Sequence, residues 1–190
     1  LNRLKEIGLI KNVSLLPHGI LDLKPKPHKK YFFTKFVNKI FKKTKIASYG
    51  FCLPNKGYKE LIHSIDILRR KDIFVKLDIY CAIYNSNYQY YFEELKELII
   101  HLGLEKLVKL DPEYKSDKQV LRLLSYHDFT VFPYQNSNES SSAAVRNGLA
   151  TLKPVLVTPL PIFDDVSTLV DFCLGFSPND LATSIENMID

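Results

Sequence analysis

The sequence predicts an α/β protein with a mostly parallel, Rossmann-like sheet that is covered by helices on both faces. Short apolar runs alternate along the chain with helical patterns of about 10 to 15 residues, which is typical of βαβ units with right-handed crossovers. The 190 residues are enough to bury one sizeable core. Hydrophobic residues make up 46% and charged residues 25%, an ordinary composition for a globular protein. We therefore expect one domain over residues 1–190, with a basic linker and helix at about 23–45.

The first residues read as a short amphipathic helix over 1–11, followed by a short strand over 12–16 that Pro17-His18-Gly19 stops. The sequence starts in the middle of a helical pattern, so we expect a piece of a longer protein. The N-terminus has no signal-peptide pattern, and no apolar run approaches the roughly 18 residues that span a bilayer. These features predict a cytoplasmic location.

A basic segment follows, with no Asp or Glu between Leu23 and Lys59. Alternating lysine and proline at 23–27 predicts an extended linker. The stretch KKYFFTKFVNKIFKKTK then places aromatic and basic residues at helical spacing. This helix either lies in a membrane interface, which would bring the protein to the inner face of a membrane, or packs against protein. Nucleic acid is not expected as a partner, because no base-stacking fold signature accompanies the charge.

From residue 46 the pattern becomes regular. A strand at 46–51 leads into a loop with Lys56, and the helix at 58–70 has its apolar residues on one side. Alternation predicts a half-buried strand over 74–83. The helix that follows at about 87–102 is expected to end at Gly103, because a positive φ costs glycine little.

The second half continues in the same way. A strand at 107–110 ends at the turn Asp111-Pro112, and Ser116 begins the next helix. Further strands are expected at 128–132 and 154–157, with a last short one at 171–176. Asn179 or Asp180 is expected to cap the terminal helix.

The cysteines and the paired aspartates do not predict a metal centre. Cys52, Cys81 and Cys173 are far apart and odd in number, so we expect buried thiols. Asp164-Asp165 would suit a cation, but a solvated turn is the favoured interpretation, since hard cations usually need more ligands.

The stretch from Pro133 to Ala150 is the first candidate site. It leaves a buried strand, crosses a polar loop and enters a helix whose first turn is expected to carry Ser140 to Ser142, with Glu139 at the entrance. Free N–H groups and the helix dipole favour a phosphate-like anion there, in the crevice where open α/β sheets bind ligands. From spacing alone, the alternative that these residues merely cap the helix is favoured.

The loop with Lys56 and Gly57 is expected at the same edge of the sheet. A lysine beside backbone N–H groups suits a diphosphate, and the Glu139 carboxylate suits sugar hydroxyls. The two loops together therefore predict a nucleotide diphosphate sugar as the ligand.

From about residue 12 to 187, the sequence resembles the C-terminal half of GT-B fold glycosyltransferases of the retaining group 1, or family 4. The matching pieces stand in the family's order: PHG at 17–19, the segment GFCLPNKG at 50–57, DFTVFPYQNSNESSSAAVRNGLA at 128–150 and KPVLVTPLPIFDDV at 153–166.

The resemblance implies a Rossmann-type module that holds the donor, with the acceptor bound by a separate N-terminal domain. It assigns the diphosphate to Lys56 and the donor sugar to Glu139, the two catalytic candidates. The further positions that it places around the donor are Gly50, Phe51, Gly57, Leu110, Ser140, Ser141, Ser142 and Asn147. No cofactor is required, and the donor is expected to be a UDP- or GDP-sugar.

Two residues depart from the family pattern. Phe51 stands where an arginine usually follows the glycine, and Asn147 replaces the second glutamate of the Glu-x7-Glu motif. Arg146 is not expected to compensate, because adjacent helix positions point apart. Two functions stay open: a donor-binding half that transfers a hexose to a glycan or lipid-linked acceptor with retention, and a degenerate scaffold or interaction domain.

Overall fold

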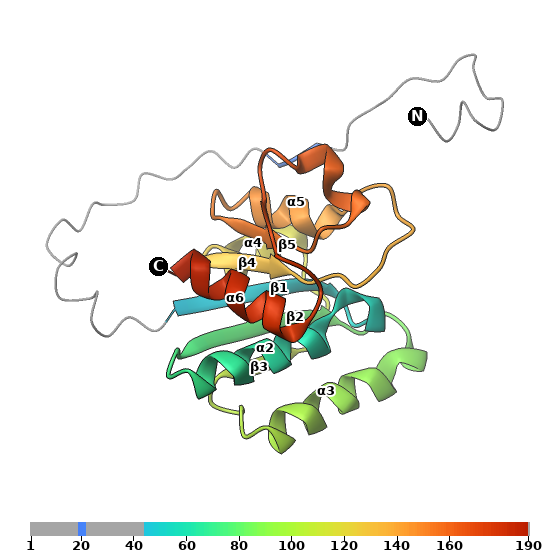
Figure 1. The fold of residues 1–190 in the computed structure, drawn as a ribbon. Coiled ribbons are helices and arrows are strands. Elements are labelled where there is room, and N and C mark those ends of the chain that lie inside the picture. The colour runs from blue at the N-terminus through green and yellow to red at the C-terminus, as the bar shows by residue number, and fades with distance from the viewer. Residues whose placement is uncertain (1–18, 22–43, 190) are drawn as a thin grey trace, which may run out of the picture.

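The computed structural model describes residues 19–21 and 44–189 (Figure 1). The helix predicted at 1–11, the strand predicted at 12–16 and the basic stretch up to residue 43 lie outside this part of the chain. Within the described ranges, no helix is long and apolar enough to cross a membrane.

Six parallel strands form one sheet in the order β3-β2-β1-β4-β5-β6. Their bounds are β1 Thr44–Phe51, β2 Val75–Ala82, β3 Val108–Asp111, β4 Phe129–Phe132, β5 Val155–Val157 and β6 Asp171–Phe172. The order is that of doubly wound nucleotide-binding sheets. The predicted fold class is confirmed.

Strand β1 is the pivot of this topology. It pairs with β2 on one side, where Ile46 is opposite Leu77, and with β4 on the other, where Ile46 is opposite Phe129. Along the chain, β2 and β3 are added on one side of β1. The chain then crosses to the other side of β1 and adds β4, β5 and β6 there. The strand order therefore reverses between β1 and β4, and open α/β sheets bind their ligands at the carboxyl ends of the strands at such a reversal.

Helices cover both faces of the sheet, as Figure 1 shows with α2, α3 and α6 in front and α4 behind. The α-helices are α2 Tyr58–Arg70, α3 Gln89–His101, α4 Asp117–Leu124, α5 Ala143–Leu149 and α6 Pro178–Ile189, with short 3-10 turns at Pro54–Lys56, Ser86–Tyr88 and Pro161–Val166. Successive side chains of β1 point to opposite faces of the sheet and so contact both helix layers. Ile46 packs into the core beneath α2, α3 and α6, whereas Ala47 packs against α4.

Helix α2 buries the apolar side that the sequence predicts. Its apolar residues Leu61, Ile62, Ile65 and Leu68 are each no more than 1% exposed. Their spacing forms one apolar stripe, and each fully buried side chain of this size stabilises the fold by about 1.5–3 kcal/mol. All three cysteines are buried and free, as expected.

The helix ends include one confirmed prediction and one wrong one. Gly103 has φ 64°, and the Leu104 N–H donates to the Ile99 carbonyl at 2.9 Å, so the chain leaves α3 as predicted. The expected cap of α6 at Asn179 or Asp180 is wrong, because the helix begins at Pro178. Ser177 and Asp180 form a reciprocal capping pair, in which the Asp180 N–H donates to Ser177 Oγ and the Ser177 N–H to Asp180 Oδ2.

Two further elements differ from the predicted ones by more than a residue or two. Strand β6 covers only 171–172 instead of 171–176, and the helix expected at 87–102 is divided into a 3-10 turn and α3.

His127 ties the end of α4 to the sheet. It is 5% exposed, and its two ring nitrogens lie 3.0 Å from the Leu123 carbonyl oxygen and 3.0 Å from Asp78 Oδ2 on β2. The hydrogen bond with His127 holds the pKa of Asp78 below its usual value, against the opposing effect of burial. The pair therefore stabilises the ionised carboxylate.

We predict that His127→Ala lowers the free energy of unfolding at pH 7 by about 1–2 kcal/mol, because it removes both hydrogen bonds of a buried ring. Urea denaturation measures the change. His101→Ala is the matched control, since His101 is exposed at the end of α3 and should change stability by less than about 0.5 kcal/mol. Equal effects of the two substitutions would contradict the role given to His127.

Candidate functional site

The loops after β1 and β4 meet at the carboxyl edge of the sheet and share a cavity of about 320 Å³. It is lined by Tyr49, Gly50, Phe51, Lys56, Ala82, Tyr114, Lys115, Asp117, Tyr134, Glu139, Ser142, Ala143, Ala144 and Asn147. Its place between β1 and β4 is the reversal point of the strand order. The two loops that the sequence singled out are therefore brought together.

Backbone contacts join the two loops directly. The Gln135 N–H donates to the Asn55 carbonyl at 2.9 Å, and the Asn55 side-chain amide donates to the Asn136 carbonyl at 3.3 Å. Gly57 has φ 72°, and a Cβ there would lie 1.8 Å from the carbonyl oxygen of Pro133. Only glycine allows the first loop to approach the second this closely.

Lys56 is one of the two lysines that line the cavity. The residue is only 7% exposed, and its Nζ lies 3.8 Å from the centroid of the Tyr134 ring. The ring face attracts the ammonium group and replaces part of its lost hydration. Burial nevertheless lowers the pKa of Lys56, while the negative charge of Glu139 acts in the opposite direction.

Tyr134 connects Lys56 to the start of α5. Its hydroxyl lies 3.2 Å from Ser142 Oγ, and Ser142 Oγ accepts a hydrogen bond from the Val145 N–H at 3.3 Å. The Tyr134 carbonyl accepts from the Thr158 hydroxyl at 2.6 Å, which fixes the loop from the side of β5. Burial raises the pKa of Tyr134 to about 12, so the hydroxyl stays neutral.

The start of α5 differs from the prediction. The helix begins at Ala143 with Ser142 as its N-cap, so the expectation that Ser140 to Ser142 occupy its first turn is wrong. Ser142 caps because its hydroxyl reaches the Val145 N–H, which leaves the two preceding serines outside the helix. Ala143 and Ala144 line the cavity together with Ser142, whereas Ser140 and Ser141 do not.

Glu139 stands on the exposed loop before α5 and lines the cavity. Its backbone N–H donates to Ser137 Oγ at 3.1 Å, which shapes the loop ahead of the helix. The carboxylate is close enough to influence the pKa of Lys56. The two catalytic candidates therefore share one cavity.

The other predicted donor positions divide into two groups. Gly50 and Phe51 line the cavity, but Gly57 and Leu110 do not. Gly57 joins the loops, and Leu110 lies on β3 packed against the core. Phe51 is 43% exposed, with its ring centroid 4.8 Å from that of Tyr84, so this wall of the cavity is aromatic.

Asn147 also lines the cavity, and its side chain hydrogen-bonds the hydroxyl of Tyr49. The neighbouring Arg146 is buried, donates to the Ser142 carbonyl at 3.0 Å and pairs with Asp165. The expectation that Arg146 does not serve the cavity agrees with these contacts. Asp165, one of the two aspartates considered for a cation, is part of this ion pair.

Sequence reasoning missed a set of polar residues that line the same cavity: Tyr49, Tyr114, Lys115, Asp117 and Tyr134. They come from β1, from the segment that leads into α4 together with the first residue of α4, and from the loop after β4. Only the capping pattern at Ser116 marked the second of these segments. No local motif indicated that it would face the loop with Lys56.

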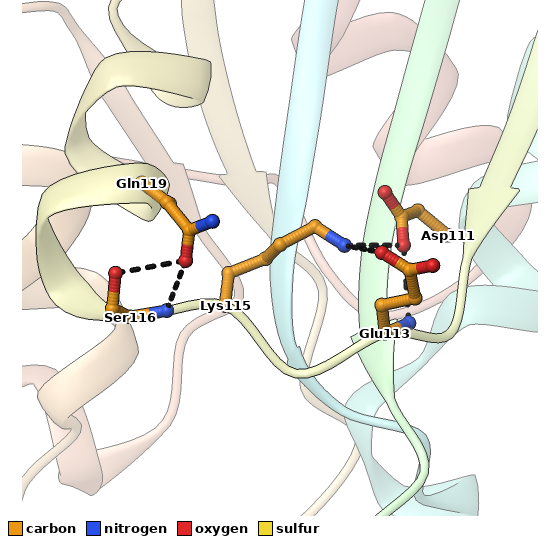
Figure 2. A network of polar contacts seen from close by, with 5 residues as sticks. All are labelled: Asp111, Glu113, Lys115, Ser116 and Gln119. Atoms are coloured by element: carbon orange, nitrogen blue, oxygen red, sulfur yellow. Dashed lines mark hydrogen bonds and ion pairs between the residues drawn. The ribbon is translucent and has the colours of Figure 1, made fainter.

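Two carboxylates bind the ammonium group of Lys115, as Figure 2 shows, so this lysine is already paired within the protein. Its Nζ donates to Asp111 Oδ1 at 2.9 Å and to Glu113 Oε2 at 2.8 Å. Partial burial acts to lower the pKa of Lys115, but these hydrogen bonds outweigh it and the pKa is raised. The segment then enters α4 through the Ser116 N–H, which donates to the Gln119 side chain at 2.9 Å.

In the part of the chain that the structure describes, no group of three or more His, Cys, Asp or Glu side chains is placed to hold a metal ion.

The family of this chain follows from its sequence as a whole. The model of the family described as Glycosyl transferases group 1 matches residues 31–189. The chain belongs to the group 1 glycosyl transferases. A comparison with curated protein sequences gave no match.

Several solved structures have the same fold as this group 1 domain. A glycosyltransferase from Rickettsia africae is 17% identical with a TM-score of 0.64, over 76% of this chain and 37% of that one. The Anabaena protein HepE, in complex with UDP and glucose, is 18% identical with a TM-score of 0.65, over 78% and 39%. A UDP-forming trehalose-phosphate synthase from Burkholderia xenovorans is 10% identical with a TM-score of 0.66, over 76% and 36%.

This group 1 domain therefore spans somewhat more than a third of the length of the structures that it resembles. Their likeness shows a shared GT-B type of α/β domain.

We predict that Gly57→Ala lowers the free energy of unfolding by at least about 3 kcal/mol and opens the cavity, because the added Cβ collides with the Pro133 carbonyl. Gly103→Ala is the matched control. Its φ of 64° is similar, but nothing lies within 4 Å of the added atom, so it should cost only about 1–2 kcal/mol. Chemical denaturation compares the two, and equal losses would show that the loops do not depend on this contact.

Proposed function

We propose that this chain is the donor-binding half of a retaining glycosyltransferase. It holds a UDP- or GDP-hexose whose sugar is moved to a glycan or a lipid-linked acceptor. One observation carries the proposal: a buried lysine faces a cavity at the reversal point of a doubly wound sheet, in a chain of the group 1 family.

Lys56 binds the diphosphate in this proposal. A diphosphate carries two or three negative charges, and a desolvated ammonium group makes short, charge-assisted hydrogen bonds to such oxygens. Ala143 and Ala144, in the first turn of α5, line the same cavity, and we assign their backbone N–H groups as additional donors. Since α5 has only seven residues, we assign the larger contribution to Lys56.

The chemistry that follows is departure of a nucleoside diphosphate. As the bond between the sugar and the distal phosphate breaks, negative charge grows on the phosphate and positive charge on the sugar ring. Lys56 stabilises the former because it is fixed against Tyr134 before the reaction begins. Glu139 accepts hydrogen bonds from the sugar hydroxyls and orients the ring. The acceptor hydroxyl then attacks the face that the leaving group occupied and gives its proton to the departing phosphate oxygen, so the configuration is retained.

The acceptor half lies outside this chain in our proposal. The similar structures are about twice as long, and the cavity opens at the edge of the sheet where a second domain can close over it. This half is therefore expected to bind the donor but not to turn over alone. We place the whole enzyme in the cytoplasm, with peripheral contact at the inner face of a membrane when the acceptor is lipid-linked.

A second function is a degenerate scaffold or interaction domain. Two residues favour it: Phe51 gives the cavity wall an aromatic ring instead of a cation, and Asn147 brings no charge. Both substitutions reduce the attraction for a donor without disturbing the fold.

Isothermal titration calorimetry with UDP, GDP and UDP-glucose separates the two functions. The donor-binding half should bind at least one nucleotide with a dissociation constant below 1 mM, that is, with more than about 4 kcal/mol. HepE was crystallised with UDP and glucose, which makes UDP the first ligand to try. No binding of any of the three at millimolar concentration would reject this proposal and favour the scaffold.

We predict that nucleotide affinity falls as the pH rises from 7.5 to 10, because burial lowers the pKa of Lys56 and the neutral amine does not attract a diphosphate. The second phosphate pKa, roughly 6, lies below this range. Titrations across the range should show a flat profile for Lys56→Arg, whose guanidinium stays charged. Parallel profiles for wild type and Lys56→Arg would assign the pH dependence to another group.

We also predict that Phe51→Arg strengthens UDP or GDP binding roughly tenfold, because one charge-assisted hydrogen bond contributes about 1.5 kcal/mol or more. Phe51 already lines the cavity and is exposed, so a longer side chain fits without entering the core. Phe51→Leu, which adds no charge, is the control and should not tighten binding. Equal affinities of both variants would place the diphosphate away from residue 51.

A further inference from the structure

A second polar group lines the cavity beside Lys56 and Glu139. It consists of Tyr49 on β1, Asp117 at the first position of α4, and Asn147 on α5. None of these three side chains belongs to the diphosphate site proposed above. They come from three separate elements, so a shared function requires that they converge in space.

Tyr49 is the point at which they converge. It packs against the residues of α4 and also against those around α5, two helices that contact each other. Its hydroxyl is hydrogen-bonded by the Asn147 side chain. Burial is the first cause that raises the pKa of Tyr49, and the Asp117 carboxylate is the second, in agreement with the position of both residues on the wall of one cavity.

Asp117 is available to a ligand. It is exposed, lines the cavity and makes no ion pair within the ranges 19–21 and 44–189. The nearest basic neighbour in sequence, Lys115, is already bound by Asp111 and Glu113. Asp117 is thus a carboxylate that faces the cavity without a cation to neutralise it.

The chemistry of this group fits a vicinal diol. A carboxylate accepts two hydrogen bonds and donates none, so it does not suit a phosphate, but it suits two adjacent hydroxyl groups. Asn147 and Tyr49 add a donor and an acceptor on the other side. In a nucleoside diphosphate, the part that carries such a diol is the ribose, which lies directly next to the phosphates.

We propose that Asp117 binds the ribose diol of the donor nucleotide, and that the Asn147–Tyr49 pair orients it. The inference rests on the proposed function, since it takes the ligand to be a nucleoside diphosphate. Its new content is that the carboxylate for the ribose comes from α4, whereas position 147 on α5 contributes only a neutral amide.

The test compares UDP or GDP, whichever the wild type binds more tightly, with its 2′-deoxy and 3′-deoxy analogues by calorimetry. The wild type should prefer the ribonucleotide to at least one deoxy analogue about tenfold or more, as expected for a lost hydrogen bond to a charged group. Asp117→Asn should weaken binding of the ribonucleotide by a similar factor and largely abolish this preference. The affinity for the deoxy analogue should change little.

Glu113→Gln is the matched control, because Glu113 is a carboxylate of the same segment that does not line the cavity. It should leave both affinities unchanged. Circular dichroism melting of each variant checks that α4 stays folded.

The outcomes separate the two proposals. A wild type that binds no nucleotide refutes the donor-binding function itself. A wild type that binds, with Asp117→Asn unchanged or with equal losses for the ribonucleotide and both deoxy analogues, overturns the assignment of Asp117 and leaves the donor-binding function standing.

Discussion

The contact between the Lys56 ammonium and the Tyr134 ring holds the candidate site together. A lysine that is only 7% exposed has lost most of its water, which is unfavourable for a charge. The ring, 3.8 Å away at its centroid, offsets part of that loss. Because the lysine comes from the loop after β1 and the ring from the loop after β4, the contact exists only where the strand order reverses. The Lys56 ammonium group can therefore be buried against this ring only because the whole sheet has this strand order.

Most of the fold could be predicted from the sequence because its signals are local. Apolar spacing in α2 and a glycine after α3 each determine structure within a few residues. The helix starts were harder. Three consecutive serines offer three possible caps for α5, and the choice of Ser142 depends on Tyr134, which lies eight positions earlier. At α6, Ser177 and Asp180 both have capping side chains, and the proline between them decides which one caps.

The site was predictable only in part, for a related reason. Lys56 and Glu139 stand in recognisable loops, so their convergence followed from the expected topology. Asp117 and Tyr49 stand in ordinary positions of a helix and a strand. They reach the cavity because α4 packs against α5 across the end of β1. This tertiary contact cannot be read from the residue types. The departures at positions 51 and 147 were visible in the sequence, but the partners of these residues, Tyr84 and Tyr49, were not.

The hydrogen bond from the Gln135 N–H to the Asn55 carbonyl, together with the close approach of Gly57 to Pro133, ties the two loops firmly to each other. The conformational entropy of ordering these loops is lost during folding, so a ligand that enters the cavity does not lose it again. The same stiffness has a mechanical consequence. If this domain and a second one swing together during turnover, as our proposal requires, the bending must occur in a hinge outside these loops, and the two loops move as one unit.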